Sequence, residues 1–412
     1  MFLLPKIEKV TRDATLSHFF LMFGYKLFSL YFPLFLVARG MSLPEVGYTY
    51  LLIYLPIALF APFVGFFNHK INPAILASVG ILGYGVYVLG MILIPHQTWW
   101  GTALFYFWQI LLGISAALFF VSARAILISS PIESYDRAFG WFYTAPFYAE
   151  ALAPAVGAFF IWKFDFVGVF IFSIILQFFT AIFCFTQLGL QPTRHPPAEG
   201  GPLQKIRPLD RYFNFQKFQK NYQEAFQKIK SKMVLLPILI SFSVLLLAGF
   251  YHAFFILFLK DQLVWSQEMI LIFISVFSVL FSPLSLLLIK YLEKIISQKN
   301  IFQGGLITGF SSIIFGLSLP VLNFLSVLII NLGKSAGALI CNAGRSGLVS
   351  QSLKTEPEEA GAIDTIFSPL GIAFGALISG LIIGFLGYQL LFILGGVFVV
   401  LVAIISKKFA KI

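Results

Sequence analysis

The chain has little charge for its length. Only 11% of its 412 residues are charged, while 59% are hydrophobic. Soluble proteins carry roughly 25% charged residues, so these charges are too few to cover the soluble domains that this length would otherwise predict. Disorder is excluded as well, because disordered chains are rich in charge and poor in apolar residues. The composition therefore predicts an integral membrane protein.

Cysteine and histidine are also scarce, and this limits the chemistry that the chain can perform. Cys184 and Cys341 both lie in apolar runs and provide no disulfide framework. The five histidines lack metal-ligand spacing, and no G-x-S-x-G or H-E-x-x-H motif occurs. Residues 333–335 imitate the end of a nucleotide-binding P-loop, but Leu328 occupies the position of its first glycine. We therefore expect no enzyme, no cofactor and no metal.

Long apolar runs occupy most of the chain. A helix needs about 20 apolar residues to span a bilayer, and continuous rather than alternating runs exclude transmembrane strands. The runs predict an all-α membrane protein of twelve spans: a bundle of six in residues 1–188, a linker at 189–232 and a bundle of six in 233–412. The predicted spans are 16–37, 46–67, 73–94, 99–123, 139–161, 166–188, 233–258, 267–290, 302–320, 322–345, 361–384 and 387–406.

Lys and Arg are distributed unevenly between the two sides of this layout. Of the 28, 23 fall on the side of both termini and the linker, three on the other side and two within spans. Cytoplasmic loops carry an excess of Lys and Arg. We therefore expect a multi-pass protein of the plasma (cell inner) membrane with both termini and the linker in the cytoplasm. The net charge of +11 follows from this topology and does not indicate nucleic-acid binding.

The linker has two parts of different character. Residues 191–202 are rich in Pro and Gly. In the second part, aromatic and aliphatic residues recur at spacings of 3, 4, 4 and 3, accompanied by lysines; they are Phe215, Phe218, Tyr222, Phe226 and Ile229. This pattern predicts a basic amphipathic helix on the inner leaflet. An ordinary linker with some helix is the alternative.

The two halves share a short repeat. The sequence LGISA at 112–116 recurs as LGKSA at 332–336, and each copy is followed by an arginine, Arg124 or Arg345. Six spans, a linker and six further spans fit the same interpretation. Parallel six-span halves, related by an axis along the membrane normal, are a known transporter architecture.

With this arrangement the sequence resembles the major facilitator superfamily over nearly the whole chain. Residues 39–47, RGMSLPEVG, are similar to the family's G-x-S-x-x-E-x-G before span two. The family's latch loop after span two is matched only in part, because His69 replaces its acid, and Gln109 replaces an arginine of the family's drug/proton antiporters. The retained latch positions are Gly65, Lys70, Glu293 and Lys294. The resemblance implies two bundles that alternate access to a central substrate.

Four ionisable side chains fall inside the spans, where each is costly unless it faces a cavity or a partner. They are Lys26, Glu150, His252 and Lys334. Lys26 and Glu150 either form a structural bridge, or Glu150 carries a coupling proton. His252 is either a hydrogen-bonded interior residue or a proton carrier. For Lys334, a substrate contact competes with snorkelling or a backbone carbonyl partner.

Six further residues complete the candidate site. Possible hydrogen-bonding partners of the substrate are Tyr25, Gln109 and Asn331, and gate residues near the cytoplasmic helix ends are Arg124, Arg345 and Asp364. The sequence thus predicts a monomeric secondary transporter of a small molecule, surrounded by lipid, with proton coupling and an organic anion as the finer expectations. Three alternatives stay open: drug or lipophile efflux by the same fold, a membrane-embedded transferase of lipid-linked substrates, and a transport-dead sensor.

Overall fold

The computed structural model describes residues 5–29, 32–93, 99–189 and 215–410, and within these ranges every regular element is a helix. Ten helical stretches among them are long and apolar enough to cross a membrane, which confirms the predicted all-α class. The elements are α1 (Lys9–Ser29), α2 (Phe32–Ala38), α3 (Leu43–Asn68), α4 (Pro73–Leu93), α5 (Trp99–Ser129), α6 (Tyr135–Gly189), α7 (Phe215–Ile229), α8 (Lys232–Asp261), α9 (Gln267–Leu292), α10 (Ser297–Leu317), the 3-10 turn η2 (Leu319–Val321), α11 (Phe324–Ser352) and α12 (Pro357–Ala410).

Two of these helices each contain a pair of predicted spans. α6 has 55 residues and α12 has 54, and each changes direction at a single residue. Asp165 has φ 61° and ψ −178°, and Gly387 has φ 71° and ψ 176°. The two halves therefore turn at equivalent places with the same backbone conformation, as an internal repeat predicts.

The predicted break between spans nine and ten is confirmed. α10 ends at Leu317, and η2 separates it from α11. Asn323 caps α11, with its side chain accepting from the backbone N–H of Ser326 at 3.0 Å. This capping interaction satisfies a backbone donor that the first turn of the helix leaves free.

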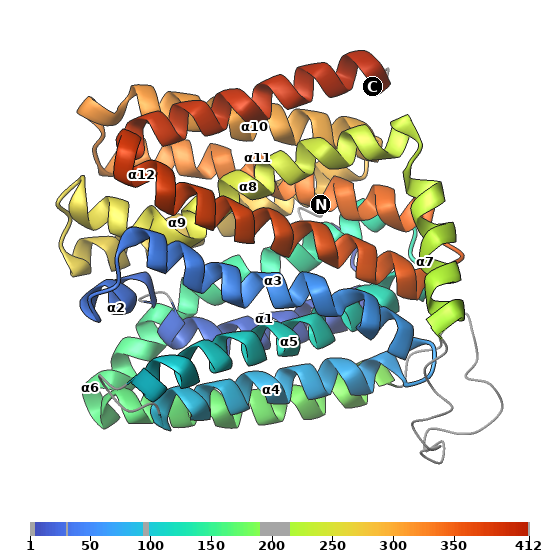
Figure 1. Cartoon of the computed structure of the whole chain (residues 1–412), viewed down its shortest axis with the longest axis horizontal. Coiled ribbons are helices and arrows are strands. Elements are labelled where there is room, and N and C mark those ends of the chain that lie inside the picture. Colours follow the sequence, from blue (N-terminus) through green and yellow to red (C-terminus); the bar gives the residue numbers. More distant parts are fainter. Residues whose placement is uncertain (1–4, 30–31, 94–98, 190–214, 411–412) are drawn as a thin grey trace.

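The two halves meet along α3, α5 and α6 of the first and α9, α11 and α12 of the second. α3 and the first part of α12 lie side by side across the middle of the molecule (Figure 1). Glycine permits their close approach, because a Cβ at Gly47 would lie 2.7 Å from the carbonyl oxygen of Ala376. We call the end of the molecule that carries α7 the α7 end, and the end that carries α2 the opposite end.

α7 forms where the amphipathic pattern predicts it, and part of its apolar face packs on protein, while Phe226 of the same face is 43% exposed. Its placement on the inner leaflet stays a prediction. The Phe218 ring is 5.6 Å from that of Phe63, and the Tyr222 hydroxyl donates to the carbonyl of Pro62 at 2.8 Å. Ile229 is buried as well. The end of α3 offers both an aromatic ring and a hydrogen-bond acceptor, so the part of the face formed by Phe218 and Tyr222 packs on protein. The Pro/Gly-rich part of the linker lies outside the described residues.

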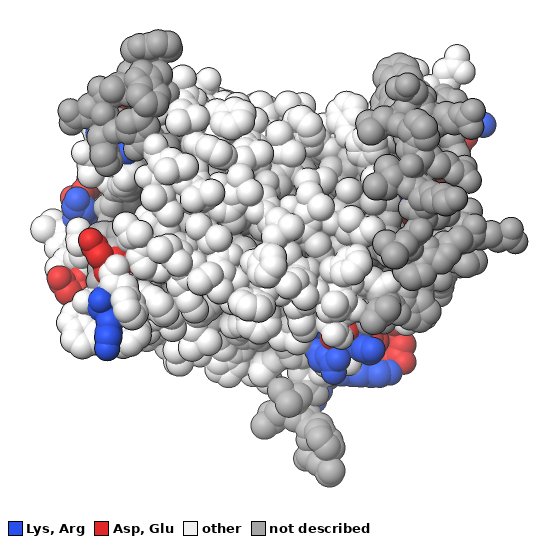
Figure 2. All heavy atoms as spheres, turned by 90° about the horizontal axis from the view of Figure 1, so that it is seen from below, with Lys and Arg blue, Asp and Glu red and all other residues white. Residues whose placement is uncertain are grey.

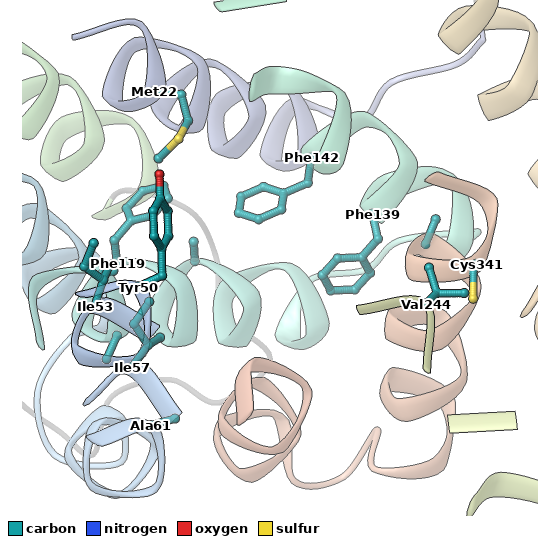
Figure 3. Close-up of a cluster of buried hydrophobic side chains, with 14 of the residues drawn as sticks. Met22, Tyr50, Ile53, Ile57, Ala61, Phe119, Phe139, Phe142, Val244 and Cys341 are labelled. Atoms are coloured by element: carbon teal, nitrogen blue, oxygen red, sulfur yellow. The ribbon is translucent and has the colours of Figure 1, made fainter. Parts of the chain in front are cut away.

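Apolar side chains of both halves form one large core. Figure 3 shows Tyr50 and Ile53 of α3, Phe142 of α6, Val244 of α8 and Cys341 of α11 in this cluster. On the face seen in Figure 2, the charged side chains that are drawn gather toward the two ends of the molecule, and the band between them consists of uncharged residues. Many large apolar side chains are exposed on the described surface, among them Leu59, Phe185 and Ile272. A band of this kind is the surface that a bilayer covers, so the chain is a multi-pass membrane protein.

Candidate functional site

An ion pair lies in the middle of the first half. Lys26 of α1 and Glu150 of α6 form a salt bridge, and their side chains remain 17% and 19% exposed. Apolar helices position both groups, since α1 packs along α6. The structure thus brings together the two residues whose pairing the sequence left open. The charge pair is therefore only partly buried, within two helices that are long stretches of mostly apolar residues.

Three side chains of the second half face this pair. The Lys334 ammonium of α11 lies over the Tyr251 ring of α8, 3.3 Å from its centroid, which is a cation–π contact. His252 of α8 is exposed, and its ring is 6.1 Å from that of Tyr54 on α3. Since Tyr54 belongs to the other half, His252 lies where the two halves meet.

Electrostatic interactions connect these groups across the interface. His252 experiences the charges of both Lys26 and Lys334, and Lys334 experiences that of Glu150. The carboxylate of Glu150 neutralises one ammonium only. With His252 neutral, the group consequently has a net charge of +1, and Lys334 has an aromatic face but no carboxylate within ion-pair distance among the described residues.

Two of the predicted hydrogen-bonding residues are engaged elsewhere. Gln109 is buried between α4 and α5, where it accepts from the Tyr87 hydroxyl at 3.3 Å. Asn331 is 3% exposed and donates to the carbonyl of Val327 in its own helix at 2.9 Å. The third, Tyr25, is partly exposed beside Lys26, with its ring against Phe28 and Tyr84.

The three predicted gate residues form one buried network on the α7 side of this group. Asp364 of α12 pairs with Arg345 of α11 at 2.9 Å and with Arg124 of α5 at 3.3 Å. Tyr143 of α6 accepts from Arg345 at 3.0 Å, and its hydroxyl is 2.8 Å from that of Ser346. The network therefore joins α5 and α6 of one half to α11 and α12 of the other.

A second polar contact between the halves lies closer to the α7 end and was missed by the sequence reasoning. Asp136, just before predicted span five, accepts from Ser297 at 2.7 Å and from Asn300 at 2.8 Å. Burial raises the pKa of Asp136 to about 6, although these two hydrogen bonds oppose the rise. The neighbouring Arg137 pairs with Glu293 of the second half and with Glu8. An acidic residue at a loop–helix junction is common, so nothing in the sequence indicated that Asp136 would contact the other half.

The other latch residues have separate roles in packing. A Cβ at Gly65 would lie 2.5 Å from the Tyr222 hydroxyl, so this glycine permits α7 to approach α3. Lys70 lies 4.9 Å from the Phe66 ring, and Lys294 is exposed. His69, which replaces the family's acid, is within 2.8 Å of Glu359 on α12. Of the latch, Gly65, His69 and Glu293 join elements distant in sequence.

Helical halves that meet around a charged, accessible centre define a membrane transporter fold. The family model of the Major Facilitator Superfamily matches residues 14–361, and the chain belongs to this superfamily. No curated protein matches the chain at a significant level.

Solved structures with the same fold are distant in sequence. The human organic anion transporter MFSD10 (TETRAN) has a TM-score of 0.70 at 14% identity, with 96% of this chain and 99% of that chain covered. A bacterial homologue of the iron transporter ferroportin, in an outward-facing state, has a TM-score of 0.65 at 14% identity, covering 98% and 100%. These likenesses establish the fold.

Proposed function

We propose that this protein is a proton-coupled secondary transporter of a small organic anion, which works by alternating access between its two halves. One arrangement supports the proposal: Lys26 pairs with Glu150, the charges of Lys26 and Lys334 both reach His252, and the four groups sum to +1 while His252 is neutral. Transporters of this architecture bind their substrates near the bilayer midplane, at the interface of the repeats.

The charge of the group favours an anionic substrate. An uncompensated charge in a low-dielectric site is costly unless a ligand neutralises it. Lys26 has Glu150 as its partner, while Lys334 has only an aromatic ring and the more distant charge of that carboxylate. A carboxylate or phosphate bound beside Lys334 would supply the missing charge. One structural neighbour is described as an organic anion transporter, but at 14% identity that likeness concerns the fold, and the anion preference rests on Lys334.

The polar contacts between the halves favour a conformation that is closed at the α7 end. The Arg124–Asp364–Arg345 network and the Asp136 contacts all lie on that side of the central group. Access to His252 would then come from the opposite end. The positive-inside distribution favours the cytoplasmic side of the plasma membrane for the α7 end, and with that orientation this conformation faces outward.

Glu150 is the residue that we assign to proton coupling. Its side chain is 19% exposed, and its carboxylate forms a salt bridge with Lys26. In proteoliposomes, Glu150→Gln should abolish accumulation driven by a pH gradient and leave substrate exchange intact. Unchanged pH-driven uptake by Glu150→Gln would contradict the assignment. The double change Lys26→Met with Glu150→Leu is the matched control: a purely structural bridge predicts that it restores pH-driven uptake.

Drug or lipophile efflux is the second candidate, and one observation favours it. The rings of Tyr54 and Tyr251 flank His252 and Lys334, and aromatic faces attract organic cations. Transport of lipophilic cations but not of organic anions by the wild-type protein would favour efflux over the main proposal.

A further inference from the structure

Three side chains with metal-ligand atoms meet at the α7 end, away from the central group. His69 follows α3, while Glu358 and Glu359 lie in the first turn of α12. One ligand atom from each residue lies within 4.8 Å of the other two. Nε2 of His69 is 2.8 Å from Oε1 of Glu359, and Nδ1 is 3.9 Å from Oε2 of Glu358. The two halves thus contribute one nitrogen and two oxygen ligands to one place.

The hydrogen bonds of this cluster leave part of it unsatisfied. Oε1 of Glu359 accepts from Asn221 of α7 at 2.8 Å and lies at the same distance from His69. Its second oxygen, Oε2, is buried and has no hydrogen-bond partner among the described residues, in a residue that is 2% exposed. A buried carboxylate oxygen without a partner is costly. A cation bound by both oxygens of Glu359 would remove that cost.

The charge and the access of the cluster fit a divalent cation. Both carboxylates lie beside the imidazole of His69, so the cluster has a charge of −2 while His69 is neutral. The partial positive charge at the N-terminus of α12 offsets only part of this negative charge. The side chains of His69 and Glu358 are 33% and 18% exposed, which leaves a route for an ion and room for water ligands.

We propose that His69, Glu358 and Glu359 bind a divalent transition-metal cation that joins the two halves at the α7 end. An imidazole with carboxylates suits ions such as Mn²⁺, Fe²⁺ and Zn²⁺, whereas Mg²⁺ and Ca²⁺ take oxygen ligands. Because the ligands come from α3 and α12, the ion holds together the ends of two helices that must separate when this end opens. The proposed cation binding needs only these three residues, so it does not depend on which substrate the protein transports.

The test is a metal titration of the purified full-length chain in detergent micelles. Zn²⁺ and Mn²⁺ should each bind at one site per chain and raise the temperature of unfolding, because a ligand that binds only the folded state stabilises it, and Mg²⁺ should do neither. His69→Gln still donates a hydrogen bond to Glu359 but is a poor metal ligand, and should weaken Zn²⁺ binding by about tenfold or more. Glu356→Gln is the matched control, because Glu356 pairs with Lys228 at 2.6 Å and should leave binding unchanged.

A second variant keeps the proposal testable if His69→Gln folds poorly. His69→Cys supplies a thiolate, which is a good zinc ligand, and should retain Zn²⁺ binding. Equal Zn²⁺ affinity in the wild type and in folded His69→Gln would overturn the proposal, as would the absence of saturable binding by the wild type. Loss of Zn²⁺ binding in folded His69→Cys would do the same. None of these measurements involves transport. A failure of the metal-site proposal is therefore distinct from a failure of the proposed transport function.

Discussion

At the scale of single residues, Lys334 decides the charge preference that we propose. Its ammonium lies over the ring of Tyr251. Among the described residues, the carboxylate whose charge reaches it is that of Glu150, which is already paired with Lys26. Lys334→Gln removes the charge and keeps a polar side chain of similar reach. We expect it to weaken binding of the transported anion by about 1–3 kcal/mol, the usual range for a charge-assisted contact, as measured by calorimetry or by inhibition of flux.

The matched control for Lys334 is Lys260→Gln, at the exposed end of α8. It removes the same charge far from the centre and should leave anion binding unchanged. Tighter binding of an organic cation than of any anion by the wild type would contradict the charge argument and favour lipophile efflux.

The individual site residues were predictable from the sequence only in part. Charged residues inside apolar runs are conspicuous, so Lys26, Glu150 and Lys334 could be found without a structure. Tyr54 and Tyr251 could not, because aromatic residues occur throughout the spans and nothing marks which ones face the centre. The sequence also does not show in which direction a polar side chain within a helix points. Gln109 was predicted to contact substrate, yet it is buried against Tyr87.

At the scale of the helices, α6 and α12 turn with the same backbone conformation but with different residues at the turn, Asp165 in α6 and Gly387 in α12. Gly387 has no Cβ and adopts its positive φ freely, whereas Asp165 holds nearly the same conformation with a side chain. Such a conformation costs about 1–3 kcal/mol for a residue other than glycine. We therefore expect Asp165→Gly to raise the temperature of unfolding in micelles and Gly387→Ala to lower it. If the temperature of unfolding fell in both variants, the interactions of the Asp165 side chain would stabilise the fold by more than its strained backbone destabilises it.

Element boundaries could be predicted well where local chemistry marks them. The break between α10 and α11 follows from Pro320 and from Asn323, which caps the next helix. The environment of α7 could not be predicted. An amphipathic pattern identifies an apolar face, but the same face can meet lipid or protein. Here Phe63 and Pro62 of α3 contact Phe218 and Tyr222, while Phe226 of the same face stays exposed.

At the scale of the whole molecule, the orientation in the membrane is a prediction of the charge distribution. Val264, between α8 and α9, is 83% exposed at the opposite end, and Lys354 is exposed between α11 and α12. A membrane-impermeant maleimide added to intact cells should label Val264→Cys and not Lys354→Cys. The natural Cys184 and Cys341 are buried and should give little background. Labelling of Lys354→Cys from outside would reverse the orientation.

Opening of the α7 end is a motion that the proposed alternating access requires, and we propose that Asp364 holds this end closed. Its carboxylate is the partner of both Arg124 and Arg345, all three nearly or fully buried. Removing one member of a buried charged pair costs about 3–5 kcal/mol, because the remaining charge has lost its partner. In Asp364→Asn, two arginines would face each other across the halves, and separating the halves lets water solvate them. We therefore expect Asp364→Asn to favour the open α7 end.

The hydroxyl of Ser297 provides a reporter for this opening. It is buried in the closed contact and donates to Asp136 of the other half, and Ser297→Cys is nearly isosteric. Adding Asp364→Asn should speed maleimide labelling of the introduced thiol at least about tenfold, since 1.4 kcal/mol already corresponds to a factor of ten. Asp261→Asn, which makes the same chemical change at the opposite end, is the control and should leave the rate unaltered. An unchanged rate in a folded Asp364→Asn protein would mean that the network stabilises each half without holding the two together. Faster labelling in Asp364→Asn would instead indicate that the carboxylate of Asp364 keeps the α7 end of the molecule closed.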